Sequence, residues 1–477
     1  MARTKDSLEA DKRQGVPAGY LDRRYLGDNA GGGGGGSSHG AGTGAAQAPA
    51  TMPSPPAAQQ EVVPGDLPPA YSFSDPNIYS TIPPQFTTSL SNSSLDTYRD
   101  LKVDQKRASE LVATKAFAFD RPVFVHTSNI SSSTLVIEPD TNLSNKDAVV
   151  IIAEVTSQIS GLDNKCTVTT TINELNEYEF FVCSTASIWS LKTMSCRFIV
   201  RVPSTYNGSH PGIRVALTNG RADMSYINNI SFGFIDLKTT CGDVSLNNVL
   251  GGNIRINTTR GTLKASNVVA AELFEALTTN SKVSLVDVRA QRVNTATSNS
   301  SISLTTVAGE AVHAETSNSK IDCTNVSAVS VKLTTTNSPI ETNHLVASNL
   351  YLNTRNAKVE GTWRIKNLLD VVTTNSRISS TILLQDPLAP VNIRLSTTNS
   401  KIQAYLPAES FRGVFDAKTS NSKATVQSQR ANNASSPPIQ FIINDKSYKR
   451  GTIGSADSVL HHFSASTTNS GIEVRLV

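Results

Sequence analysis

The second half of the chain repeats a short motif, Thr-Thr/Ser-Asn-Ser, many times. It is first written TTNSK at 278–282 and returns with small changes at 297, 316, 335, 373, 397, 419 and 467. The reference positions, counted on the motif's Asn or its equivalent, are Asn219, Cys241, Arg260, Asn280, Asn299, Asn318, Asn337, Asn356, Asn375, Asn399, Asn421 and Asn469. From 241 to 375 their spacing is 19 or 20 residues, and the later steps are 24, 22 and 48 residues. A repeat of this length without a helical period predicts a β-solenoid, in which each coil stacks on its neighbours.

Apolar residues stand at fixed distances after each reference position, at three, five, eight and thirteen residues. The column at three residues is Val244, Leu263, Val283, Ile302, Ile321, Ile340, Val359, Ile378, Ile402 and Ile472. The columns at eight and thirteen residues end at Leu383 and Leu388. Alternation by two places one run on one face of a strand, so each coil is expected to wrap two or three short strands round an apolar interior. The 48-residue step is either two long coils or one coil with an insertion.

Threonine stands two residues before the reference position in every coil from Thr239 onward. The residue four before it is mostly apolar, so alternation predicts that both the Thr and the Asn point inward. The residue after the Asn is almost always small, as a tight corner requires. We therefore expect a Thr ladder beside an Asn ladder at an inner corner, with neighbours about 4.8 Å apart.

The pattern divides the chain into a tail and a β domain. Residues 1–110 are rich in Gly and Pro and have no apolar period, so this tail is expected to be disordered. Short apolar runs separated by turn residues follow it and are typical of strands. We predict an all-β domain over 115–477. It comprises a β-rich cap at 115–212 and a single-chain β-solenoid at 213–477, with coils of about 19–24 residues.

Composition narrows the function classes and the compartment. The 43 basic and 39 acidic residues nearly cancel, so no nucleic acid partner is expected. Five scattered cysteines lack the paired spacing of metal sites and are interpreted as buried free thiols in a reducing compartment. The N-terminus has no apolar leader, and no apolar run is long enough to span a bilayer. We expect a cytoplasmic protein, with the cell surface, reached by unconventional export, as the alternative. The oligomeric state is left open.

The residue two places after the reference Asn is often basic and is predicted to point outward. This basic stripe comprises Lys282, Lys320, Lys358, Arg377, Lys401 and Lys423. It would suit an anionic polymer or a lipid surface. The neighbouring outward column contains acidic residues that would partly neutralise it, so a solvated face is the simpler interpretation.

No catalytic, cofactor-binding or metal-ligating residues are predicted. Polysaccharide-active β-helix enzymes gather acidic or basic side chains on adjacent coils, whereas acidic residues here are few and dispersed. His313 and His344 have no obvious carboxylate partner at coil spacing. We therefore expect a protein that is not an enzyme and carries no cofactor.

The most specific short motif lies in the tail, where Pro68, Pro69 and Tyr71 form a PPxY sequence. A proline pair followed by a Tyr at this spacing fits the aromatic groove of a WW domain. The hypothesis is that the tail recruits a WW-containing protein partner.

Three segments carry a resemblance to a known family: FIVRVPS at 198–204, IRVALTNGRADM at 213–224 and STTNSGIEVRL at 466–476. Together with the repeated motif they resemble the putative-adhesin repeat domain of unknown function, over roughly 195–477. The corner Ser and the Gly/Pro-rich tail with its PPxY are similar to the fungal members. The resemblance implies a β-solenoid and no established catalytic residues.

The sequence as a whole predicts a non-enzymatic scaffold or interaction protein built on a β-solenoid. An adhesin-like cell-surface binding protein is the alternative, and a polysaccharide-active β-helix enzyme is a lesser one.

Overall fold

The computed structural model describes residues 101–477 with several gaps. The gaps are 108, 119, 141–147, 159–161, 163–164, 185–193, 204–208, 226, 228–229, 429–437 and 455–459. The chain divides into two units, Met1–Ser74 and Asp75–Val477, and all described residues lie in the second. Every element of the described residues is a β-strand, which confirms the predicted fold class. Strands begin at Lys102, earlier than the expected start at 115; the rest of the predicted tail lies outside the described residues.

The N-terminal strands precede the regular repeats. They are β1 (Lys102–Arg107), β2 (Glu110–Ala118), β3 (Val123–Ser128), β4 (Ser132–Asp140), β5 (Ala148–Ser157), β6 (Cys166–Ile172), β7 (Tyr178–Ser184), β8 (Met194–Pro203) and β9 (Ser209–His210).

The central strands are longer and more regular. They are β10 (Ile213–Leu217), β11 (Gly220–Met224), β12 (Ser231–Cys241), β13 (Val244–Arg260), β14 (Leu263–Thr278), β15 (Val283–Thr297), β16 (Ile302–Thr316), β17 (Ile321–Thr324), β18 (Ser327–Thr334), β19 (Ile340–Asn353) and β20 (Val359–Val372).

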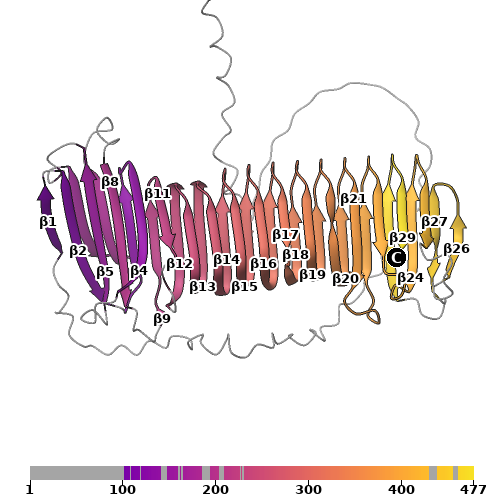
Figure 1. Cartoon of the computed structure of the whole chain (residues 1–477), viewed down its shortest axis with the longest axis horizontal. Coiled ribbons are helices and arrows are strands. Elements are labelled where there is room, and N and C mark those ends of the chain that lie inside the picture. The colour runs from indigo at the N-terminus through magenta and orange to yellow at the C-terminus, as the bar shows by residue number, and fades with distance from the viewer. Residues whose placement is uncertain are drawn as a thin grey trace, which may run out of the picture. The chain divides into compact units, whose positions relative to one another are not determined.

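The C-terminal strands complete the stack, which Figure 1 shows running from indigo to yellow. They are β21 (Ile378–Leu384), β22 (Asn392–Ser396), β23 (Ile402–Leu406), β24 (Gly413–Thr419), β25 (Ala424–Ser428), β26 (Ile439–Asn444), β27 (Tyr448–Ile453), β28 (His461–Thr467) and β29 (Ile472–Leu476).

Each central coil has two arms, and each arm pairs in parallel with the same arm of the next coil. Between β15 and β16, Val283 pairs with Ile302 in the first arm and Val293 with Val312 in the second. In the following coil the two arms are the separate strands β17 and β18, and both pair with β16. Their inward side chains form one continuous apolar core.

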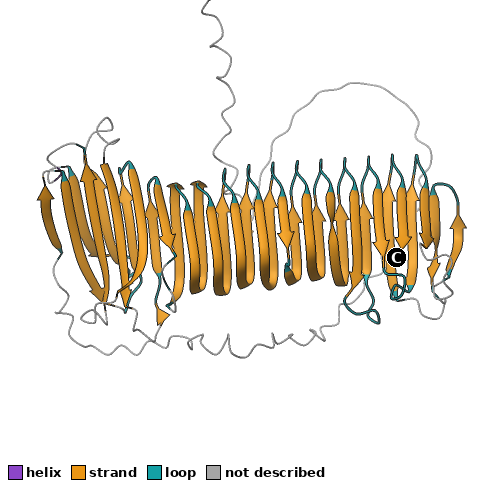
Figure 2. Cartoon of the chain, viewed as in Figure 1, coloured by secondary structure: helices purple, strands orange, loops and turns teal. Residues whose placement is uncertain are grey.

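The two arms are joined at two different corners. One corner is the bend at the repeated motif, and Figure 2 shows these bends as a row of loops along one edge of the stack. The other corner lies within the long strands, or between β17 and β18 in the coil where the two arms are separate, at a column of residues with φ between 52° and 55°. This column is Asn248, Asn267, Asp287, Thr306, Asn325 and His344. Left-handed backbone at one residue per coil turns the chain while the ladder continues on both sides.

The inward position of the repeated Thr is confirmed. From Thr239 to Thr467, every member of the column is at most 8% exposed. The hydroxyl of Thr316 donates to the carbonyl oxygen of Ser300 at 3.1 Å, and that of Thr373 donates to Ala357 at 3.3 Å. Eight of the eleven buried Thr hydroxyls donate in this way to the bend of a neighbouring coil, which accounts for a polar side chain at this inward position. The hydroxyls of Thr258, Thr278 and Thr335 have no hydrogen-bond partner among the described residues.

The inward position predicted for the Asn is wrong, although the Asn ladder exists. The strands end at the Thr, so alternation by two stops there and the Asn is exposed on the bend. Successive side-chain amides donate to one another at 2.7–2.8 Å. The ladder comprises Asn280, Asn299, Asn318, Asn337, Asn356, Asn375, Asn399, Asn469 and Asn421, in spatial order.

The apolar column three residues after the reference position is buried throughout. Two other predicted core residues are not in the core. Leu383 is half-buried, and its neighbour Ile382 points inward instead. Leu388 is 82% exposed, because this coil carries an extra turn in which the Leu388 amide donates to Asp386.

At both ends the stacking order departs from the chain order. Near the N-terminus, β3 lies between β7 and β10. Near the C-terminus, β28 lies between β22 and β24, and β29 lies between β23 and β25. The 48-residue step is therefore one coil with an insertion, the antiparallel hairpin of β26 and β27.

Candidate functional site

The predicted basic stripe divides into paired and exposed members. Lys282 and Lys423 are exposed at the two ends of the stripe. Four members, Lys320, Lys358, Arg377 and Lys401, lie beside carboxylates of the first arm. The stripe is therefore a row of alternating charges along much of its length.

The centre of this row is a carboxylate held between two lysines. The Nζ atom of Lys320 lies 2.6 Å from Glu341 and 2.8 Å from Asp322. The Nζ atom of Lys358 lies 2.9 Å from the other oxygen of Glu341 and 3.0 Å from Glu360. Each lysine thus bridges two neighbouring coils.

The row continues toward the C-terminus. Arg377 lies 3.4 Å from Glu360. Farther along, Lys401 donates to Glu473 at 2.7 Å, and Gln403 and Arg475 contact the same carboxylate. We use the name ion-pair row for the six charged side chains on the coils from Lys320 to Arg377, without the Lys401 group. They are Lys320, Asp322, Glu341, Lys358, Glu360 and Arg377.

A shallow hollow of about 400 Å³ lies on this row. It is lined by Asp322, Thr324, Glu341, Thr342, Asn343, Lys358 and Glu360. It borders the place where the left-handed corner column stops. Thr342 pairs with Gly361 and Leu345 with Trp363, so the later coil has one residue fewer at this corner.

Trp363 occupies the inward position that the shortened corner leaves. Its indole donates to the Thr342 hydroxyl at 2.6 Å and is fully buried. A Cβ atom on Gly361 would lie 1.9 Å from the Thr342 oxygen, so only glycine fits between them. The floor of the hollow is therefore fixed by packing.

The ion pairs keep the central groups charged. Hydrogen bonds from Lys320 and Lys358 lower the pKa of the Glu341 carboxyl. Hydrogen bonds to the carboxylates raise the pKa of both lysines. Glu341 therefore carries no proton near neutral pH and accepts hydrogen bonds only.

Three carboxylates stand in register on adjacent coils, because Asp322 pairs with Glu341 and Glu341 with Glu360. These three residues belong to the outward acidic column that the repeat places beside the basic stripe, and stacking in register brings them together on adjacent coils. Within the described ranges, no group of three or more His, Cys, Asp or Glu side chains has an arrangement suited to a metal ion.

The histidines singled out in the sequence lie outside this row. His344 belongs to the left-handed corner column. His313 lies 3.7 Å from Glu315, two residues along the same strand face, and burial lowers its pKa. The partner of His313 is therefore a strand neighbour rather than a residue of the next coil.

All five cysteines are free thiols. Cys166, Cys196 and Cys323 are buried as predicted, whereas Cys183 and Cys241 are only half-buried. Burial raises the pKa of Cys166 to about 11 and also raises the pKa of Cys196 and Cys323, which keeps all three thiols protonated and unreactive.

The PPxY residues Pro68, Pro69 and Tyr71 lie outside the described residues. In the part of the chain that is described, there is no helix of the length and hydrophobicity needed to cross a membrane.

Comparison with known proteins supports the predicted kind of domain. The model of a family described as Toastrack DUF4097 matches residues 128–291, a range that begins and ends earlier than the resemblance expected from the repeats. The comparisons support a repeat domain of unknown function and give no support to its fungal branch. No match is found among curated proteins.

Two solved structures align over most of their own length. One is a putative cell adhesion protein from Clostridium sporogenes, with 8% identity over 77% of this chain and 99% of that chain, at a TM-score of 0.16. The other is a putative adhesin from Bacteroides fragilis, with 9% identity over 76% of this chain and 96% of that chain, at a TM-score of 0.21.

Proposed function

We propose that this protein is a non-enzymatic binding scaffold and that a polar partner docks on the ion-pair row. The observation that carries the proposal is the Glu341 carboxylate, held by two lysines on the outer face of a fully packed stack. Charges fixed in this way present a defined pattern without rearrangement on binding. Because the cations are already paired, the face suits a partner with both charge signs, such as a protein surface, better than a polyanion.

The test is affinity purification with the full chain and matched charge reversals. Lys358→Glu places an anion between Glu341 and Glu360 and should abolish recovery of the partner. Lys264→Glu, on the same arm but outside the row, should leave it unchanged. Equal recovery with both variants would show that the row is not the docking face.

A polysaccharide-active enzyme is the second candidate, favoured only by the alignment of Asp322, Glu341 and Glu360. Glycoside cleavage needs one carboxyl group that is protonated at working pH. The pKa of Glu341 is shifted the opposite way, so we rank this function below binding. Release of sugar from an acidic polysaccharide, lost in Glu341→Gln, would reverse the ranking.

Two further proposals concern the cellular location of the protein and the binding partner of its N-terminal tail. We propose a cytoplasmic scaffold; an adhesin-like protein at the cell surface is the alternative, and locating a tagged full chain separates the two. We also propose that the PPxY motif binds a WW domain. If Tyr71→Ala binds an isolated WW domain as well as the unmodified chain does, the motif is not used.

A further inference from the structure

Apart from β9, which is only two residues long, the described strands leave four sheet edges without a second neighbour, and three of them are poorly suited to pairing. Strand β1 carries four charged residues among its six. Strand β26 has a register shift between Phe441 and Ile443. Strand β25 is only five residues long. Charge, bulges and shortness are the features by which proteins protect open edges.

The fourth edge, β6, has none of these protections. Its sequence CTVTTTI contains no charge and no proline, and it pairs with β7 through an unbroken seven-residue register. Thr, Val and Ile are the residues that favour strands most. Strand β6 therefore has no sequence feature that would prevent another strand from pairing with its free edge.

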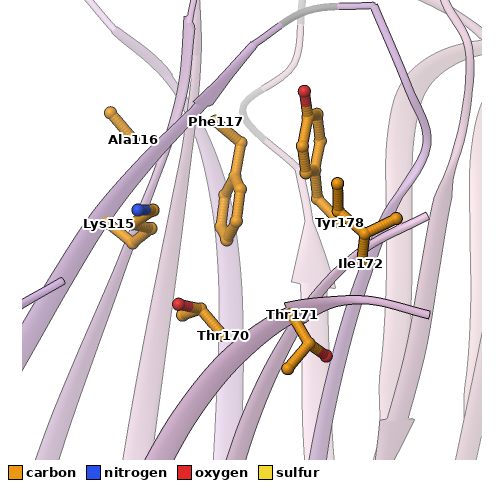
Figure 3. A pocket seen from close by; sticks show the side chains of 7 residues that line it. All are labelled: Lys115, Ala116, Phe117, Thr170, Thr171, Ile172 and Tyr178. Carbon is orange, nitrogen blue, oxygen red and sulfur yellow. The ribbon is translucent and has the colours of Figure 1, made fainter. Parts of the chain in front are cut away.

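A pocket lies beside this edge, between β6 and β2. It has a volume of about 210 Å³ and is lined by Lys115, Ala116, Phe117, Thr170, Thr171, Ile172 and Tyr178 (Figure 3). Ile172 follows the buried Cys166 by six positions, so alternation along β6 places both side chains on the core face. Ile172 is nevertheless 51% exposed. The apolar interior is thus open at this end of the stack.

The described part of the chain begins beside the pocket. Lys102 pairs with Thr114 in an antiparallel register, which places Leu101 next to Lys115, a lining residue of the pocket. The nearest strand-like stretch upstream is QFTTSL at 85–90, where Phe86 and Leu90 alternate with polar residues. The ten residues from 91 to 100 can span about 33 Å, enough for the chain to turn back.

We propose that residues 85–90 pair with β6 as an additional strand and place Phe86 in the pocket. The segment matches β6 in having no charge and is rich in Thr. Its tether raises its effective concentration to the millimolar range, which favours it over a second copy of the chain. The proposal does not depend on the ion-pair row.

Other parts of the chain are less well placed. The segment 185–193, which contains Trp189, follows Ser184. Ser184 pairs with Cys166, at the opposite end of β6 from Ile172 and the pocket.

The first test is hydrogen exchange of β6 amides in the full chain. Slow exchange is expected in the unmodified protein, because the added strand would pair with the free amides of β6. Phe86→Asp should accelerate exchange at least tenfold, whereas the tail control Phe73→Asp should not. Fast exchange in the unmodified chain, or no response to Phe86→Asp, would overturn the proposal. Acceleration by Trp189→Asp instead would assign the edge to the segment 185–193.

The second test fills the pocket with a larger side chain on β6 itself. Thr170→Arg would fill the pocket and should make residues 85–90 at least tenfold more sensitive to proteolysis. Thr167→Arg, on the exposed face of the same strand, should leave cleavage unchanged. Equal cleavage in both variants contradicts the proposal. Protection of β6 that depends on protein concentration, with a dimer in sedimentation, would show that a second copy occupies the edge.

Discussion

The central coils and the two ends of this molecule are built from the same kinds of strand but are assembled differently. From β13 to β20 each coil contacts the coil before it and the coil after it in the chain. At the ends, β3 and β28 are inserted between strands that are not their neighbours in sequence. Antiparallel strands are then added outside them, such as β27 beside β24.

The difference shows what a repeat pattern specifies. Periodic apolar residues determine which side chains face inward, and in the middle of the stack only the adjacent coil is available to pair. At an end, an unpaired face must be covered, and any segment with the same period can cover it. Because β28 and β29 are inserted between other strands, the coil that they form has paired strands on both sides and is protected from fraying.

The largest effect is expected from removing residues 461–477, which form the inserted coil. Because β28 and β29 have partners on both sides, their loss separates β24 and β25 from the stack. Limited proteolysis should then cleave within 413–428, while β20 stays resistant. Continued resistance of 413–428 would mean that the inserted coil is not essential to this end.

Truncating a buried side chain in the middle of the stack should cost more than truncating an exposed one on the edge strand at the N-terminal end. Ile321→Ala removes a fully buried side chain and should lower the free energy of unfolding by about 2–5 kcal/mol. Val103→Ala changes a residue that is 48% exposed on β1, so about 1 kcal/mol or less is expected. Urea denaturation of both variants measures the difference. Equal losses would contradict the contrast between middle and end.

Acid should weaken the N-terminal end through His210. Burial lowers the pKa of His210 to about 4, so the unfolded chain binds the proton more readily. Its contribution is present above about pH 6.5 and is lost as the pH falls toward 4, by up to about 3 kcal/mol. Denaturation as a function of pH should show a shallower slope in His210→Gln. His462→Gln, at an exposed position, should keep the original slope.

The smallest effect is expected along the Asn ladder. Asn337→Ala removes the amide hydrogen bonds to Asn318 and Asn356, a loss of about 1 kcal/mol, because water replaces part of each exposed bond. Asn353→Ala alters an exposed Asn of β19 outside the ladder and should change stability less. Thermal unfolding compares the two. Identical shifts would show that the ladder marks the register without stabilising it.

The sequence by itself determined the fold class, the coil length and the inward faces, because these depend on local alternation within each strand. The buried Thr column and the apolar column from Val244 to Ile472 follow directly from that alternation. The exposed Asn did not follow, since alternation stops where the strand ends at the bend.

Only the tertiary structure decided which coils are neighbours and which charges meet. Lys320 and Glu341 are 21 positions apart and pair because adjacent coils are stacked in register. The insertion of β28 between β22 and β24 has no signature in the repeat, since every coil presents a similar surface to its neighbours. The physical reason is that the repeat period specifies only which side chains of a strand face inward. The order of the coils along the stack depends instead on which unpaired end of the stack a segment of the chain can reach and cover.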